Sequence, residues 1–456
     1  METQINEVDL SSRRVIASAC ILMFLISLDV TVVNVALPTI QDALSVPIGS
    51  LGIAVVAYTL PFATLLLSAG ALSDRFGAAK VYLSGVVILG IGSLIGAAAP
   101  HFTVLLLGRV VQGIGAALCM PSSLAVLRSG IPSYQMGQAI ALWGFSGSAT
   151  IAAGPIFSGV LVQYTTWQSV FMINVPVVAL AAWLILPLAQ GARQVPPGPK
   201  MSVDIIGQAL FIVSATLLVG GLTLISEQVG TAQRQVPGVM VTLAVVGTIA
   251  FLLQERRATN PVMPASLMQH KVFQSAVIVG GSVSFVNFGL VYCLSLYYGI
   301  VHEFSPLMVG VLYLPMMLAT GAATIVVERI RRAIGDRKTV ALGLASQVTG
   351  AILISLQPDQ VGGVSANAAF LGFGVGLVIP PITAGLLGSV DANLTGVASG
   401  AFSSIRQFAA AIGIVVLGLL IQRSGASIEV DLRSIGIICA AVLTIVLGIY
   451  LAAQRE

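Results

Sequence analysis

The chain has 456 residues, of which 21 are Lys or Arg and 17 are Asp or Glu. This charged share of 8 % is far below the roughly 25 % of soluble domains, while 57 % of the residues are hydrophobic and the mean hydropathy is +1.00. Such a chain could not cover a soluble surface, so the composition excludes a cytosolic enzyme, a secreted disulfide scaffold and a disordered chain. Long unbroken apolar runs favour an all-α polytopic membrane protein over a transmembrane barrel, whose strands alternate polar and apolar residues.

Fourteen apolar stretches are long enough to cross the membrane as helices, which takes about 20 residues each. In chain order they are 15–38, 50–70, 79–99, 102–127, 137–160, 168–189, 203–226, 237–254, 272–299, 306–327, 338–356, 361–387, 396–420 and 433–453. The first is too long for the core of a cleavable signal peptide, so we expect it to remain as a membrane helix. The four cysteines lie within apolar stretches without a Cys-x-x-Cys pair, which favours packing roles over a disulfide framework or a metal site.

The basic residues predict how the chain is oriented. If the stretches alternate in direction, sixteen Lys and Arg residues fall on the side of the two termini and three on the opposite side. Cytoplasmic loops carry the excess of Lys and Arg, so we expect both termini in the cytoplasm and the protein in the plasma (inner) membrane.

Two polar breaks predict the domain organisation. Residues 190–202 contain three prolines and two glycines, and residues 255–271 begin with a charged cluster. We therefore expect an N-terminal six-helix bundle over 1–190, a linker region with two additional membrane helices over 191–271, and a C-terminal six-helix bundle over 272–456.

A faint internal repeat accompanies this division. An offset of 258 residues lays Gly52 on Gly310 and Gly77 on Gly335, and it also lays Lys80 on residue 338, another lysine. Repeated halves of parallel topology are typical of many secondary transporters.

Enzymatic and nucleotide chemistry lack their usual motifs. No Gly-Lys dipeptide occurs, so there is no Walker A loop, and no His-Glu-x-x-His occurs. The segment Gly144-Phe-Ser146-Gly147 resembles the nucleophile turn of intramembrane serine proteases, but no His is available at membrane depth to activate the serine. We expect no enzyme activity, no cofactor, no metal and no nucleic-acid partner.

Asp29 is the most informative residue, because it lies about 14 residues and roughly 21 Å from Val15 along a helix. An acid at this depth costs about 2.5–3.5 kcal/mol on insertion scales. Burial favours the neutral carboxyl, so the position predicts a reversible proton site, with a carboxyl satisfied by neighbouring helices as the alternative. Arg109 lies inside the fourth stretch, stays charged when buried and needs a partner, so we expect it to act with Asp29 in proton coupling or else only to hold its helix. Gln112 shares the face of Arg109.

The segment from Gly70 to Lys80 joins the second and third stretches. Gly77 suits a backbone conformation that other residues avoid, and Asp74 can cap a helix end or accept hydrogen bonds. Arg75 and Lys80 lie on the basic side. We expect a conformational gate here, with a topology anchor as the alternative.

The fifth stretch carries Gly144-x-x-Gly147-x₆-Gly154-Pro155-x₃-Gly159. Small residues allow close helix contact, and Pro155 removes one backbone hydrogen bond. The pattern predicts a pliable seam between the two halves, or ordinary helix packing.

Together these motifs resemble the major facilitator superfamily, and more narrowly its fourteen-helix drug:proton antiporter branch. Leu28-Asp29-Val-Thr-Val-Val-Asn34-Val-Ala-Leu-Pro38 resembles that branch's first-helix signature. Arg109-Val-Val-Gln112-Gly113 resembles the fourth-helix signature linked to proton transfer, and Gly154-Pro155 resembles the antiporter signature. The resemblance implies a fold of two six-helix bundles that work by alternating access, with proton influx and drug efflux.

We therefore expect a proton-coupled antiporter, working as a monomer, that exports amphipathic organic cations such as drugs, quaternary ammonium biocides and dyes. A single clear mid-membrane acid predicts a low proton stoichiometry. The alternative is an exporter of a neutral or anionic metabolite or antibiotic, in which Asp29 handles only protons and Arg109 or Arg406 meets the cargo. A receptor or scaffold would need a larger soluble part than these short loops provide. The residues expected to line the cargo cavity are Asp29, Asn34, Tyr58, Gln112, Met120, Trp143, Tyr292, Tyr297 and Arg406.

Overall fold

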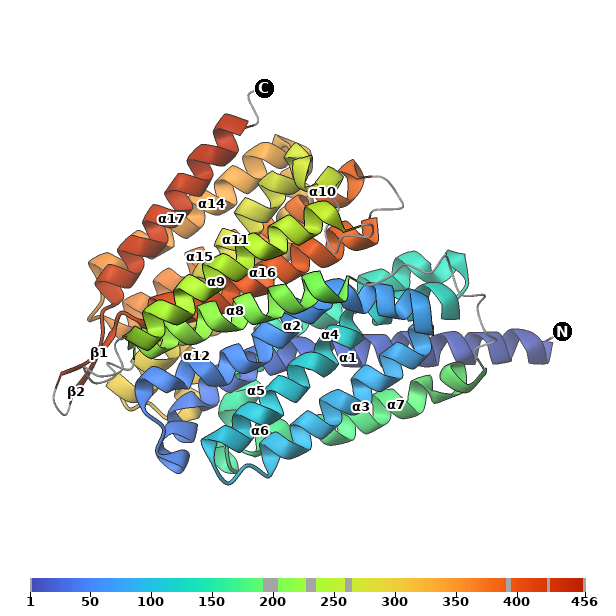
Figure 1. The fold of residues 1–456 in the computed structure, drawn as a ribbon, viewed down its shortest axis with the longest axis horizontal. Helices are drawn as coiled ribbons and strands as arrows, with labels where there is room; N and C mark the ends of the chain where they lie inside the picture. The colour runs from blue at the N-terminus through green and yellow to red at the C-terminus, as the bar shows by residue number, and fades with distance from the viewer. Residues whose placement is uncertain are drawn as a thin grey trace.

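The computed structural model describes residues 2–191, 204–226, 235–258, 265–390, 395–424 and 427–453, nearly all of them helical (Figure 1). Thirteen helices among the described residues are long and apolar enough to cross a membrane. The remaining predicted stretch is α5 (Met136–Tyr164), a continuous helix of 29 residues. The predicted all-helical membrane fold is confirmed.

The first half of the chain forms six spans. Its helices are α1 (Glu2–Leu44), α2 (Ile48–Phe76), α3 (Ala78–Ala97), α4 (Phe102–Gly130), the 3₁₀ turn η1 (Ser133–Gln135), α5, α6 (Ser169–Met172) and α7 (Asn174–Gly191). A break at Ile173 divides the sixth predicted stretch into α6 and α7.

The second half repeats this plan. Its elements are α10 (Ala265–Gln269), α11 (Lys271–Leu296), the π-helical turn η3 (Tyr297–Val301), α12 (Pro306–Leu312), α13 (Leu314–Ile334), α14 (Asp336–Leu356), α15 (Val361–Ser389), α16 (Thr395–Gly418), β1 (Ile421–Ser424), β2 (Ser427–Val430) and α17 (Leu432–Ala453). Strands β1 and β2 pair in an antiparallel hairpin that the hydropathy pattern did not predict.

Local capping fixes several of these helix ends. The Oγ of Ser305 accepts a hydrogen bond from the Met308 amide, and Pro306 fills the first turn of α12. Asp431 accepts from the Ser434 amide at 2.9 Å at the start of α17. Hydrogen bonds from Ser434 hold the pKa of Asp431 below its usual value.

Left-handed backbone conformations mark the repeat between the halves. Among the described residues the positive φ angles are 51° at Ser45, 53° at Glu303, 91° at Gly77 and 83° at Gly335. They form two pairs, each separated by 258 residues. The turns after the first and second spans of each half therefore match without insertion, which gives the faint sequence repeat a structural basis.

The two halves pack side by side, with α8 (Ile205–Ser226) and α9 (Gln235–Arg257) lying across them (Figure 1). The Gln208 amide of α8 donates to the Thr64 carbonyl of α2 at 2.5 Å and accepts from Ser68 Oγ at 2.5 Å. The ring of Phe211 packs on Phe408 of α16, with centroids 5.9 Å apart. The extra helix pair thus contacts both halves.

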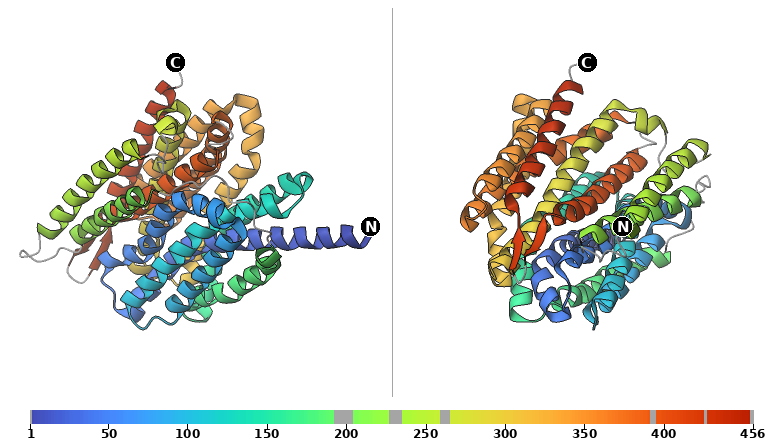
Figure 2. Two further views of the ribbon diagram at one scale, coloured as in Figure 1. Left: turned by 45° about the vertical axis from the view of Figure 1, so that its right-hand side comes forward. Right: turned by 60° about the vertical axis from the view of Figure 1, so that its left-hand side comes forward.

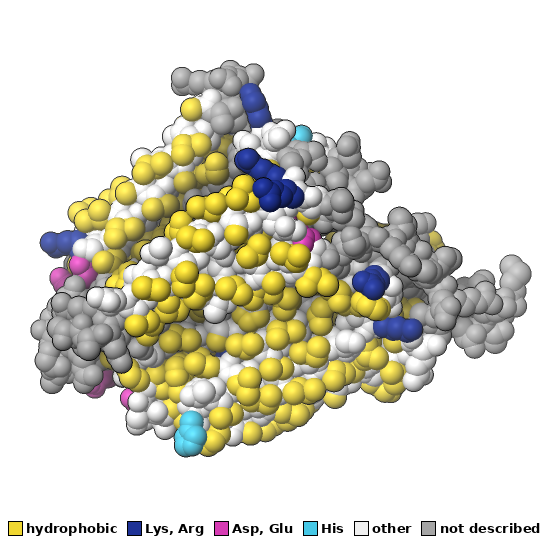
Figure 3. Space-filling model, viewed as in Figure 1, with side chains coloured by type: hydrophobic (Ala, Val, Ile, Leu, Met, Phe, Trp, Pro, Cys, Tyr) yellow, Lys and Arg dark blue, Asp and Glu magenta, His cyan; other side chains and the backbone are white. Residues whose placement is uncertain are grey.

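The helix ends on the side of the two termini form what we call the basic end, which carries Arg75, Lys80 and Arg128. On the visible face of the molecule, hydrophobic side chains cover the middle and most Lys and Arg lie towards this end (Figure 3). The helices of the two halves converge at the opposite end and diverge towards the basic end (Figures 1 and 2). At the convergent end Ser295 Oγ of α11 donates to the Asn34 carbonyl of α1.

Candidate functional site

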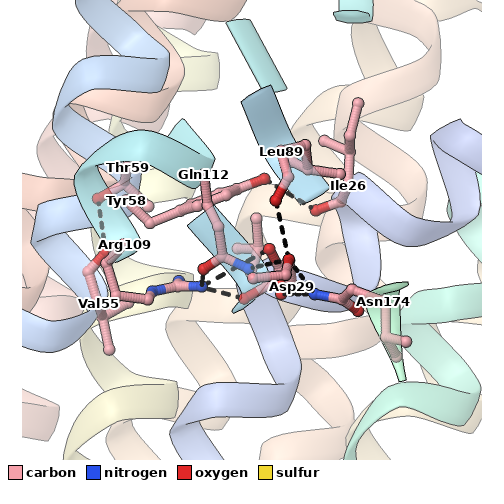
Figure 4. A network of polar contacts seen from close by, with 12 residues as sticks. Ile26, Asp29, Val55, Tyr58, Thr59, Leu89, Arg109, Gln112 and Asn174 are labelled. Atoms are coloured by element: carbon pink, nitrogen blue, oxygen red, sulfur yellow. Dashed lines mark hydrogen bonds and ion pairs between the residues drawn. The ribbon is translucent and has the colours of Figure 1, made fainter. Parts of the chain in front are cut away.

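Asp29 of α1 and Arg109 of α4 meet in the interior of the first half (Figure 4). Their side chains are 1 % and 0 % exposed, and Arg109 Nη1 lies 3.7 Å from Asp29 Oδ2. Buried opposite charges in the membrane are expensive unless they are paired and hydrogen-bonded. The rest of the site supplies those hydrogen bonds.

Neutral acceptors take the hydrogen bonds of the Arg109 guanidinium. Its Nε donates to the Ala54 carbonyl at 3.1 Å, Nη1 to Gln112 Oε1 at 3.0 Å, and Nη2 to the main-chain carbonyl of Asp29 at 3.3 Å. Its Cζ lies 4.4 Å from the ring centre of Tyr58, a cation–π distance. Because none of these bonds uses the Asp29 carboxyl, the cation is held in place whether that carboxyl is charged or neutral.

The two oxygens of the Asp29 carboxyl have different surroundings. Oδ1 accepts from Asn174 Nδ2 of α7 at 2.9 Å. Oδ2 is buried and has no hydrogen-bond partner among the described residues. A proton can therefore occupy Oδ2 without displacing an existing hydrogen bond.

Ser93 of α3 closes the network. Its Oγ accepts from Asn174 Nδ2 at 3.2 Å and from Gln112 Nε2 at 2.8 Å, and it donates to the Leu89 carbonyl at 2.9 Å. The result is a closed ring of polar side chains running from Asp29 through Asn174, Ser93, Gln112 and Arg109. Four helices of the first half meet at this ring (Figure 4).

A second feature is a cavity of about 60 Å³ between the two halves. It is lined by Thr31, Asn34, Val35, Pro155, Asn287, Phe288, Val291, Tyr313, Met316, Met317, Thr320 and Val375. We call it the central cavity. None of its lining residues is charged, and Asp29 is not one of them.

The structure distributes the predicted cargo residues over several places. Asn34 lines the central cavity, whereas Gln112 belongs to the polar ring of the first half and the aromatic ring of Tyr58 packs on Arg109 of that polar ring. Met120 and Trp143 pack beside the apolar core of that half, and the Trp143 indole donates to a neighbouring serine, Ser123, at 3.1 Å.

The predicted residues of the second half also lie apart. Tyr292 is buried where α11 approaches Gly52 of α2. The Tyr297 hydroxyl donates to the Pro358 carbonyl at 2.7 Å. Arg406 donates to Ser284 Oγ at 3.1 Å.

The predicted gate is the sharp turn between α2 and α3. Gly77 has φ 91° and its amide donates to the Ser73 carbonyl at 2.9 Å, while a Cβ at Gly70 would meet no atom within 4 Å. Lys80 is exposed, and Arg75 is exposed with its guanidinium 5.2 Å from the Phe76 ring centre. The side chain of Asp74 lies outside the described part of the structure.

The predicted seam residues lie at helix contacts. A Cβ at Gly154 would come within 2.5 Å of Thr31 Oγ1 on α1. The next residue, Pro155, lines the central cavity and its carbonyl faces Gly310 of α12. The segment thus touches both α1 and the second half.

Ser93 and Asn174 are site residues that the sequence did not indicate. Each is a small polar residue within an apolar stretch, and such residues pack in most membrane helices. Pro176 is the sequence signal that could have pointed to a helix start beside Asn174, two residues earlier.

Comparison with known proteins assigns this chain to a family. The family model described as Major Facilitator Superfamily matches residues 19–414. The chain belongs to the Major Facilitator Superfamily. Membership of this family identifies it as an integral membrane transporter and not an enzyme.

Its curated relatives include resistance proteins. The methylenomycin A resistance protein of Bacillus subtilis is 33 % identical over 407 residues, covering 87 % of this chain and 85 % of that protein. The multidrug resistance protein Stp of Mycobacterium tuberculosis is 31 % identical, with 87 % and 73 % covered. The tetracenomycin C resistance and export protein of Streptomyces glaucescens is 31 % identical, with 87 % and 74 % covered.

Solved transporters share the fold. A POT family transporter in complex with a thioalcohol-conjugated peptide has a TM-score of 0.72 at 14 % identity, with 96 % of each chain covered. The human organic anion transporter TETRAN has a TM-score of 0.66 at 15 % identity, with 96 % of this chain and 99 % of that chain covered.

Proposed function

We propose that this superfamily member is a proton-coupled antiporter that exports a drug-like organic molecule across the plasma membrane, with both termini in the cytoplasm. The observation that carries the proposal is the buried Asp29 carboxyl. Among the described residues its Oδ2 has no hydrogen-bond donor, while Arg109 keeps three neutral hydrogen-bond partners. Such a carboxyl can exchange a proton without dismantling the network around it.

The α1 helix provides the link between proton and cargo. Asp29 lies on α1 in the polar ring, and Thr31 and Asn34 lie on the same helix in the central cavity. An ionised Asp29 is attracted to Arg109 of α4 and a neutral one is not, so protonation changes how firmly α1 is held. Cargo that contacts α1 in the central cavity shifts the same equilibrium, which is the thermodynamic requirement for coupling.

The lining of the central cavity favours the uncharged antibiotic of the alternative prediction. It offers amide, hydroxyl and apolar groups and no acid. The relative described as a tetracenomycin C resistance and export protein supports an antibiotic as the cargo. Organic cations remain the second candidate, supported by the relative described as a multidrug resistance protein.

The two cargo classes differ in the charge they move. Exchange of one proton for one uncharged molecule transfers a net charge, so a membrane potential of 100 mV adds about 2.3 kcal/mol of driving force. Exchange of one proton for a monovalent cation transfers none. Export of tetracenomycin C and of the cationic dye ethidium in vesicles, at fixed pH gradient and varied potential, therefore separates the candidates.

Asp29→Asn tests the proton site. We expect this variant to lose export driven by a pH gradient in vesicles. Its dissociation constant for tetracenomycin C should stay within about twofold of the parent's, a change in binding free energy well below the roughly 1.4 kcal/mol that corresponds to tenfold. Asp42→Asn is the matched control, because Asp42 is an exposed acid on the same helix, and it should export at the parental rate. Full pH-driven export by Asp29→Asn would refute the proton site, and loss of ethidium binding would favour cationic cargo.

A further inference from the structure

Asn287 of α11 occupies the place in the second half that Asp29 occupies in the first. The two residues are 258 positions apart, the same spacing that relates Ser45 to Glu303 in the turn that follows these helices. Both intervals contain sixteen residues and end in the same left-handed turn, so the two residues correspond in the sequence repeat. The π-helical turn η3 lies between Asn287 and Glu303, whereas the chain after Asp29 is α-helical to Leu44.

Helix contacts extend the correspondence through the next two spans. Gly85 of α3 packs against Gly115 of α4, and Gly343 of α14 packs against Gly374 of α15 in the same way. The offset is thus 258 for α3 and α14, and 259 for α4 and α15. On this alignment the positions that match Ser93, Arg109 and Gln112 hold small or apolar residues, namely Ala351, Ala368 and Leu371. The second half has an amide where the first has an acid, and no counterpart of the cation.

Asn287 also differs from Asp29 in what it faces. It lines the central cavity, and its buried Oδ1 has no hydrogen-bond partner among the described residues. Asn34 lines the same cavity from the first half, is 2 % exposed, and likewise has an unpartnered Oδ1. Its Nδ2 donates to the Val30 carbonyl at 3.2 Å, so its oxygen is the free end of the amide.

The other polar groups of the cavity are already engaged. Thr31 Oγ1 donates to the Leu28 carbonyl at 3.1 Å, Thr320 Oγ1 to the Met316 carbonyl at 2.9 Å, and the Tyr313 hydroxyl to the Val291 carbonyl at 2.6 Å. Within the described part of the chain, two buried acceptors of the cavity remain without donors, and an acceptor that stays unpaired costs about 1–3 kcal/mol. A ligand bearing O–H or N–H groups would satisfy both.

We propose that Asn287 and Asn34 form the cargo-recognition pair of this transporter, accepting hydrogen bonds from hydroxyl or amide N–H groups of an uncharged cargo. This inference rests on the proposed antiport and deepens it, because corresponding positions of the repeat have different roles. Asp29 binds the proton, and Asn287 binds the cargo. A cavity of about 60 Å³ is far smaller than the roughly 300–1,000 Å³ of pockets for drug-sized ligands, so cargo reaches the pair only when the halves separate.

The first test removes one acceptor. Asn287→Ala in the full-length protein should raise the dissociation constant for tetracenomycin C about 5–10-fold, the range expected for one lost hydrogen bond. Asn34→Ala should do the same. Asn367→Ala is the matched control, because Asn367 is an amide of the same half that does not line the cavity, and it should leave binding unchanged. Unchanged binding in Asn287→Ala, or failure of the parent to bind tetracenomycin C, would overturn the proposal.

The second test converts the amide to an acid. Asn287→Asp places a carboxylate in a cavity whose lining holds no other charge, so ethidium should bind about tenfold more tightly than to the parent, and less tightly again at low pH. No gain in ethidium binding would mean that cargo does not reach Asn287. Failure of the proposed antiport would be detected by a different result, namely full pH-driven export by Asp29→Asn. That result would not change the binding measured for Asn287→Ala or for Asn287→Asp.

Discussion

Arg109 is held by neutral acceptors and Asp29 by Asn174, yet each charge still depends on the other for compensation. Removing one member of a buried ion pair strands the other and costs about 3–5 kcal/mol, whereas removing both is far milder. Arg109→Gln should therefore lower the thermal stability of the purified protein strongly, and the double variant D29N/R109Q should recover part of the loss. The measurement is a double-mutant cycle of unfolding midpoints in detergent.

Arg75→Gln is the control for that cycle. Arg75 is exposed and its cation–π contact with Phe76 is at the surface, where such contacts contribute about 0.5–1 kcal/mol. Strictly additive effects of the Asp29 and Arg109 substitutions would contradict a coupled pair.

Depth in the membrane and charge were enough to single out Asp29 and Arg109, because ionisable side chains within the hydrocarbon are rare and usually functional. The same logic cannot separate Gln112 as a network residue from Gln112 as a cargo residue, since a neutral amide is tolerated in either place. Ser93 and Asn174 carry even less signal, and only their distances to Gln112 and Asp29 reveal the closed ring.

At the scale of elements, the turns of the repeat make a prediction about backbone strain. Gly77 and Gly335 have φ of 91° and 83°, and a Cβ on either would meet no atom within 4 Å. The cost of alanine there is purely conformational, about 1–3 kcal/mol for a sparsely populated backbone region at positive φ. Gly77→Ala and Gly335→Ala should each lower the unfolding midpoint measured in detergent.

Gly70 provides the opposite case seven residues earlier. It also has open space around its Cβ position, but it lies inside α2. Gly70→Ala should leave stability unchanged or raise it by about 0.5–1 kcal/mol, the usual advantage of alanine over glycine in a helix. Equal effects at Gly70 and Gly77 would show that the turn conformation is not what these glycines provide.

Hydropathy located each span but not the end of each helix. The first predicted stretch stops at residue 38, whereas α1 continues to Leu44, because polar residues remain helical beyond the hydrocarbon. α13 continues to Ile334 for the same reason, helped by Glu328, which lies 2.9 Å from Arg331 and 3.0 Å from Arg332 one turn later. The length of an apolar stretch corresponds to the thickness of the bilayer, whereas caps and turns determine where the helix ends.

The sequence alone predicts only part of how the two halves are arranged. The offset of 258 predicted that the halves repeat, and the paired left-handed turns agree with it. The sequence could not predict that Asp29 faces the interior of its own half while its counterpart Asn287 faces the space between the halves. Which face of a fully apolar helix points inward depends on packing partners, and hydropathy contains no record of them.

One of the contacts that hold the two halves of the molecule together is an interlocked contact between α5 and α12. A Cβ at Gly159 would lie 2.6 Å from the Pro306 carbonyl oxygen, and a Cβ at Gly310 would lie 2.6 Å from the Pro155 carbonyl oxygen. Both obstacles are main-chain atoms that cannot rotate away. The proposed antiport by alternating access requires this contact, at the convergent end, to separate.

Gly159→Ala should therefore destabilise the present conformation relative to one open at the convergent end. Overpacking costs about 1–3 kcal/mol, which changes a two-state ratio by roughly 5–150-fold. Spin labels at the exposed positions Tyr164 and Met308, with Cys20 replaced by serine, would report a longer distance between α5 and α12. Gly137→Ala on the same helix has open space at its Cβ and should leave the distance distribution as in the parent. An unchanged distribution in Gly159→Ala would mean that the halves do not separate along this contact, and that the motion coupling Asp29 to the central cavity runs through other helices.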